Sequence, residues 1–91
     1  MRMELNVAAT VRIMPTGTDV KLDVIQKSVE KIAAQYGKLN SVQIKPIAFG
    51  LNALEVMLLL NDKQGGMDEI EARIAKIEGV NSVETLEVTR L

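Results

Sequence analysis

The sequence contains no cysteine and no histidine among its 91 residues. The chain therefore has no disulfide, no thiolate or imidazole ligand for zinc or an iron–sulfur cluster, and no imidazole for acid–base catalysis. Its serines have no histidine to activate them, so we expect no catalytic residue, no bound metal and no cofactor. A small secreted domain usually carries disulfides, and their absence favours the cytoplasm.

Aromatic residues and charge imbalance are also scarce. Tyr36 and Phe49 are the only aromatic residues, and the net charge is -1. Direct binding of nucleic acid relies on basic side chains that neutralise phosphates and on aromatic rings that stack on bases, so we expect no such partner. The longest apolar run, Met57–Leu60, is far too short to span a membrane, and the N-terminus lacks a signal-peptide pattern.

The remaining composition is that of one small globular domain. A chain of 91 residues with 47% hydrophobic and 25% charged residues supports one core layer rather than a deep enclosed cavity. We expect a single domain over residues 1–91, and we expect it to be a monomer.

The first third of the chain predicts a strand followed by a helix. Residues 5–13 are apolar at every second position, as in a strand with one buried face. An apolar stripe at helical spacing then predicts a helix over residues 20–36. Thr18 or Asp19 is the expected N-cap, and Gly37 is the expected residue just after the helix.

The central and later residues predict a hairpin and a second helix. Residues 41–47 alternate in polarity, residues 53–60 carry Leu or Val at every second position on one face, and the short link between the two segments favours an antiparallel pair. Residues 67–77 carry an apolar stripe at helical spacing. Asp68 and Glu71 resemble a capping box at the start of this helix.

The last predicted strand covers residues 80–88, and its alternation is imperfect. Val83 is out of phase with the later apolar residues, so either a bulge near Glu84 or a later strand start is expected. The element order indicates an α+β fold, the ferredoxin-like βαββαβ sandwich, with an antiparallel sheet in the order 4-1-3-2 and both helices on one face. Met57 and Leu59 then lie on the open sheet face, which is either a partly exposed surface or a partner surface.

Residues 46–54 join the two halves of the chain and are unusually apolar for a turn. They place Phe49 directly before Gly50. From the pattern alone, Phe49 either folds back into the core or contacts something outside the chain. Arg90, the penultimate residue, has the pattern of a solvated terminal side chain.

Two segments carry a resemblance to a known family. Residues 46–54 (Pro-Ile-Ala-Phe-Gly-Leu-Asn-Ala-Leu) resemble the Pro-Ile-x-Phe-Gly-Ile-Lys-Lys-Leu segment of the exchange domain of translation elongation factor 1-beta. Residues 88–91 (Val-Thr-Arg-Leu) resemble the end of that family, where a basic residue precedes a terminal apolar one. The resemblance covers the whole chain, and its length is that of the short archaeal members.

The resemblance implies guanine-nucleotide exchange on elongation factor 1-alpha, the GTPase that delivers aminoacyl-tRNA to the ribosome, without covalent chemistry. It implies that Phe49 wedges into the GTPase and that Arg90 reaches its magnesium and phosphate region, with Gly50 and Leu91 as neighbouring contacts. Arg90 replaces the lysine of eukaryotic members, and its planar guanidinium presents a different set of donors. Residues 46–54 and the C-terminal end of the chain should then contact one GTPase together.

Two other functions compatible with this topology rest on the open sheet face. One is a small-molecule regulatory domain that pairs through its sheet or helices, and the other is a scaffold domain without exchange activity. Met57 and Leu59 motivate both alternatives.

Overall fold

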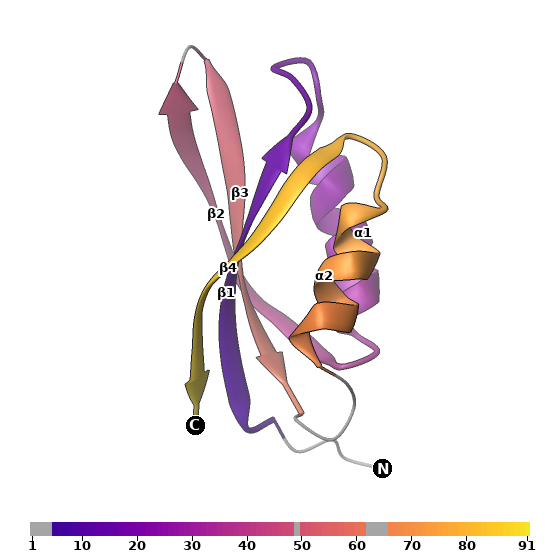
Figure 1. The fold of residues 1–91 in the computed structure, drawn as a ribbon, viewed down its shortest axis with the longest axis vertical. Helices are drawn as coiled ribbons and strands as arrows, with labels where there is room; N and C mark the ends of the chain where they lie inside the picture. Colours follow the sequence, from indigo (N-terminus) through magenta and orange to yellow (C-terminus); the bar gives the residue numbers. More distant parts are fainter. Residues whose placement is uncertain (1–4, 49, 62–65) are drawn as a thin grey trace.

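The computed structural model describes residues 5–48, 50–61 and 66–91. The secondary-structure elements in this part of the chain are β1 (Val7–Pro15), α1 (Leu22–Ala33), β2 (Gly37–Ala48), β3 (Leu51–Leu60), α2 (Met67–Ala75) and β4 (Val80–Arg90). The strands form one antiparallel sheet in the order β2-β3-β1-β4, and both helices cover the same face of it (Figure 1). The predicted ferredoxin-like α+β fold and its strand order are confirmed.

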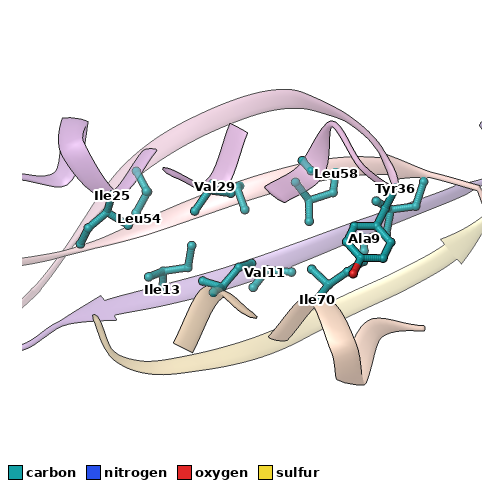
Figure 2. Close-up of a cluster of buried hydrophobic side chains, with 13 residues drawn as sticks. Ala9, Val11, Ile13, Ile25, Val29, Tyr36, Leu54, Leu58 and Ile70 are labelled. Carbon is teal, nitrogen blue, oxygen red and sulfur yellow. The ribbon is translucent and has the colours of Figure 1, made fainter. Parts of the chain in front are cut away.

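The hydrophobic core lies between the helices and one face of the sheet (Figure 2). Its largest fully buried side chains come from β1, β3 and both helices, and they are Val11, Ile13, Ile25, Val29, Leu54, Val56, Leu58, Ile70 and Ile74. Burying a side chain of this kind contributes about 1.5–3 kcal/mol relative to leaving it exposed. No polar or charged residue is buried in the described ranges, so apolar contact holds this core together.

The start of α1 differs from the prediction. A turn over residues 17–20, with the Val20 amide 3.4 Å from the Gly17 carbonyl, occupies the positions expected to cap the helix. The N-cap is Lys21, whose side chain makes no capping hydrogen bond. The prediction of Thr18 or Asp19 as the N-cap is therefore wrong.

The cap predicted for α2 is also wrong. The N-cap is Gly66, which has no side chain to offer, and Asp68 lies within the first turn of the helix. An acidic residue there still stabilises the helix, because it lies near the positive end of the helix dipole.

Gly37 has a different role from the predicted one. Helix α1 ends at Ala33 rather than at Tyr36, and Gly37 is the first residue of β2. A Cβ atom on Gly37 would lie 1.9 Å from the Leu59 carbonyl oxygen, which is far inside van der Waals contact. A glycine is needed here because the backbone passes against β3, and not because it caps the helix.

The imperfect alternation in the last strand is a β-bulge. Thr10 pairs with Glu87 and Val11 pairs with Thr85, so Leu86 is the extra residue. The predicted bulge is confirmed, two residues beyond Glu84. The extra residue restores the phase, so that apolar side chains on both sides of the bulge point toward the helices.

Candidate functional site

The first candidate site is the tip of the hairpin formed by β2 and β3. The strands pair as far as Ala48 and Leu51, so the connecting loop is only two residues long. Gly50 in this loop is exposed and has a φ of +80°, a conformation that other residues adopt with strain. Phe49, the residue on which the sequence interpretation centred, lies outside the described residues.

Exposed apolar side chains lead up to this tip along β2. Ile44 is 57% exposed and Ile47 is 43% exposed. Ile44 pairs with the buried Leu54, so its position in the sheet is that of a core residue. The sequence pattern did not identify these two residues as surface residues, because alternation gives the face of a strand and not how far the helices cover it.

A groove adjoins the same end of the molecule. A space of about 390 Å³ opens between the start of α1 and the α2–β4 connection, with Val20, Val24 and Ile25 as its apolar lining and Lys21 and Glu78 among its charged residues. A cavity of about 30 Å³ separates Gly50 and Asn52 from the β1–α1 loop. The hairpin tip therefore lies beside two loops, and together they form one end of the domain.

The second candidate site is the C-terminal end of the chain. Arg90 is the last residue of β4 and pairs with Val7. The Leu91 amide donates a hydrogen bond of 2.9 Å to the Asn6 carbonyl, and the Leu91 side chain is 68% exposed. The predicted site residues Arg90 and Leu91 thus lie on a strand that is hydrogen-bonded to its neighbour, and both are exposed.

The two candidate sites lie at opposite ends of the sheet (Figure 1). Val7 pairs with both Arg90 and Leu60, and Leu60 is at the far end of β3 from the hairpin tip. At about 3.3 Å per residue, the length of β3 separates the two sites by about 30 Å. The longest extent of the domain is 43 Å. A partner that contacts both sites must therefore reach along most of the molecule.

The described residues at the two ends offer surface for contact with another molecule. Within the described ranges, no group of three metal-ligating side chains comes together. Helices long and apolar enough to cross a membrane are likewise absent from that part of the chain. What the two ends offer is apolar surface at one and a guanidinium with an exposed leucine at the other, and these can bind a protein.

The chain matches the model of a known protein family. Residues 8–91 match the family model of the EF-1 guanine nucleotide exchange domain. Similar proteins include elongation factor 1-beta of Methanothermobacter thermautotrophicus, 37% identical over 94% of this chain and 97% of the relative. Elongation factor 1-beta of Pyrococcus horikoshii is 35% identical over 97% of this chain and 98% of the relative. Elongation factor 1-beta of Methanoculleus marisnigri is 39% identical over 92% of this chain and 95% of the relative.

A solved structure shares the fold. It is the C-terminal domain of the MgtC protein from Mycobacterium tuberculosis, with a TM-score of 0.65 over 99% of this chain and 93% of that domain. The sequences are 12% identical, so this likeness concerns the fold alone.

Proposed function

The chain belongs to the family of EF-1 guanine nucleotide exchange domains, and on this basis we propose that Phe49, Gly50, Arg90 and Leu91 are its contacts with the GTPase. Family membership carries the function itself, because the match covers residues 8–91. The protein promotes guanine-nucleotide exchange on elongation factor 1-alpha during translation elongation. It is an exchange factor and does not catalyse covalent chemistry.

The proposed contacts act by coupling two binding equilibria. A factor that binds the nucleotide-free GTPase more tightly than the GDP-bound form lowers the affinity for GDP by the same free energy. We propose that Phe49 supplies apolar contact and that Arg90 supplies positive charge near the magnesium and phosphate site. Neither role requires a nucleophile or a general base.

The way each contact is held supports this proposal. Gly50 closes a two-residue loop between paired strands, and Arg90 pairs with Val7 in the β-ladder. A residue fixed by strand pairing loses less conformational freedom on binding than one on a mobile tail. Ile44 and Ile47, which are exposed on β2, would extend the apolar contact beside the hairpin tip.

The proposed complex contains one copy of the chain per GTPase, in the cytoplasm, with residues 1–91 acting as a single domain. Because the two ends are about 30 Å apart along the strands, the GTPase would contact the domain along its length rather than at one point. Nucleic acid is not part of the proposed interface.

The exchange rate of the cognate GTPase tests these roles. Elongation factor 1-alpha loaded with fluorescent GDP should release it faster when the parent protein and unlabelled nucleotide are added. Phe49→Ala should slow the stimulated release by about 30-fold, and Arg90→Ala by about tenfold, the range expected when a central interface anchor is truncated. Lys27→Ala, on the exposed side of α1, should leave the rate unchanged.

Each outcome bears on a separate claim. If Phe49→Ala or Arg90→Ala exchanged nucleotide as fast as the parent, the role proposed for that residue would be wrong. The circular dichroism spectrum and the thermal unfolding of each variant should match those of the parent, which separates lost contact from lost folding.

A further inference from the structure

The sheet face that points away from the helices, here called the open face, has a regular pattern of side-chain size along its centre. Strands β1 and β3 are neighbours there, and they pair in an unbroken antiparallel register. Two of the neighbouring pairs on this face join a small side chain to a large one: Ala8 with Leu59, and Thr10 with Met57.

A third neighbouring pair on the open face joins opposite charges. Arg12 of β1 pairs with Glu55 of β3, and the guanidinium Nη2 lies 3.4 Å from the carboxylate Oε2. Each of these three open-face pairs across the β1–β3 boundary is therefore complementary, either in size or in charge.

The two edges of the open face carry opposite charge as well. Lys38 and Lys45 of β2 pair with Leu59 and Ala53, which places both lysines on this face. Glu84 and Glu87 of β4 pair with Arg12 and Thr10, which places both carboxylates on the same face at the other edge. These four edge residues are exposed.

A twofold axis parallel to the strands makes this face complementary to itself. Turning a second copy about such an axis, centred over the β1–β3 boundary, lays β3 over β1 and β2 over β4. Leu59 then meets Ala8 of the second copy, Met57 meets Thr10 and Arg12 meets Glu55. At the edges the lysines of β2 lie over the carboxylate edge of β4. From this match we propose that the open face binds a second copy of the chain, forming a twofold homodimer.

The edge charges fit this axis in position as well as in sign. Rotation about the strand direction keeps each residue at its own height along the strands. Lys45 therefore lies one row of side chains, about 7 Å, from Glu84 of the second copy, and Lys38 lies one row from Glu87. A lysine side chain is long enough to cover that distance. A twofold axis that lies between the two sheets but runs perpendicular to the strands would instead place the lysines of one copy over the lysines of the other.

A second copy explains the pattern better than an unrelated partner does. In a twofold interface the same surface of both copies is in contact, so one half of the surface must fit the other half. On the open face, the β1 half and the β3 half carry side chains of opposite size or opposite charge at each pair. Met57 is 37% exposed, so apolar surface remains on this face for a partner to cover. Two sheets that pack face to face with nearly aligned strands are a common arrangement.

The size of the face sets the strength of the dimer. Four strands about 4.8 Å apart and about 25 Å of strand length give about 500 Å² per copy, or about 1,000 Å² in total. This area is at the low end for specific complexes, so we expect a dissociation constant in the micromolar range. The dimer departs from the monomer expected from the sequence. It leaves the hairpin tip and the C-terminal end uncovered, because both lie at the ends of the sheet.

Sedimentation velocity of the full chain tests the dimer. Over a concentration series from about 5 μM to about 1 mM, the mass should rise from 10.0 kDa toward twice that value. The association should weaken as salt is added, because the edge contacts are charged. A mass of 10.0 kDa throughout the series would overturn the proposal.

Two charge reversals show whether the open face and the proposed axis are used. In Lys45→Glu and in Glu84→Lys, like charges face each other at both symmetry-related contacts, and each variant should dimerise about tenfold more weakly than the parent. An equimolar mixture of the two variants should regain the parent affinity, because every contact in the mixed dimer again joins opposite charges. Lys27→Glu makes the same change of charge on α1 and should dimerise like the parent.

The mixture decides between the open face and other surfaces. A dimer that forms but does not respond to the reversals, or a mixture no tighter than the separate variants, would overturn the proposed axis. A chain that stays monomeric but loses its stimulation of GDP release in Lys45→Glu would assign the open face to the GTPase instead, and would also overturn the proposal. All four edge residues are exposed, so these variants are expected to fold like the parent.

Discussion

Tyr36 is an aromatic residue whose ring closes one end of the core while its hydroxyl remains close to charged groups. Its exposed fraction is 4%. The Arg73 guanidinium lies 5.7 Å from the centre of the ring and donates a hydrogen bond of 2.7 Å to the Gln35 side chain, so it ties α2 to the end of α1. Burial raises the pKa of Tyr36 above its usual 10.0, with a further increase from Glu69 that Arg73 partly offsets.

This raised pKa predicts a loss of stability at high pH. The folded chain holds the Tyr36 proton more tightly than the unfolded chain, so the contribution is fully present below the unfolded value of 10.0 and is lost as pH rises above it. Urea unfolding at about pH 8 and about pH 11 should show a smaller decrease in the free energy of unfolding for Tyr36→Phe than for the parent. Equal decreases in both proteins would contradict this prediction.

The β2–β3 hairpin is the element on which the first candidate site depends, and its alignment is constrained at both ends. Gly50 closes the loop at one end with a positive φ. Gly37 lies at the other end, against the backbone of Leu59. The hairpin therefore requires a glycine at each end for two different reasons, a left-handed backbone at one and a close approach of two strands at the other.

Gly37→Ala should destabilise the domain strongly. The new Cβ atom would overlap the Leu59 carbonyl oxygen, and a main-chain atom cannot rotate away as a side chain can. We expect a decrease of about 2–4 kcal/mol in the free energy of unfolding, measured by urea denaturation.

Gly66→Ala is the matched control for this change. A Cβ atom there meets nothing within 4 Å, and its φ of -96° is accessible to alanine. The decrease should be below about 1 kcal/mol, since Gly66 serves only as the N-cap of α2. A Gly37→Ala protein as stable as the control would show that β2 can move away from β3.

At the scale of the whole molecule, the main feature is the distance between the two candidate sites. The sheet holds the hairpin tip and the end of β4 about 30 Å apart, with the core between them (Figure 1). Substitutions farther apart than about 7–10 Å usually act additively when no single residue contacts both of them. The two ends should therefore contribute independently to the exchange reaction.

The double variant Phe49→Ala with Arg90→Ala tests that independence. Its loss of stimulated GDP release should equal the product of the two single losses, to within about twofold. The release rate is measured under conditions in which it rises linearly with the concentration of the exchange factor. A double variant no slower than the slower single variant would show that the two residues act as one unit.

Much of the fold follows from local patterns in the sequence. The alternation of Leu54, Val56 and Leu58 predicted a buried strand face, and all three side chains are fully buried. Helical spacing identified Ile25 and Ile70 as core residues in the same way. The cap predictions were wrong because a cap depends on where the chain turns into the helix, and Lys21 and Gly66 occupy those positions.

The candidate site was predictable only in part. Gly50, Arg90 and Leu91 are exposed as the proposed contacts require, while the roles of all four site residues stay predictions. The exposure of Ile44 could not be predicted, because its place in the alternating pattern is that of a core residue. Coverage by a helix depends on contacts between segments that are distant along the chain.

The element order and the core faces were predictable from residue spacing alone, and residues 46–54 and 88–91 were enough to indicate the family. These are properties of local spacing and of motifs, which need no knowledge of distant contacts. The placement of Gly50 and Arg90 at opposite ends of the sheet, and of Arg12 beside Glu55, follows only from the pairing of the strands in the folded chain. Both facts depend on strand register, which is fixed when segments far apart in the chain align their apolar faces in one core.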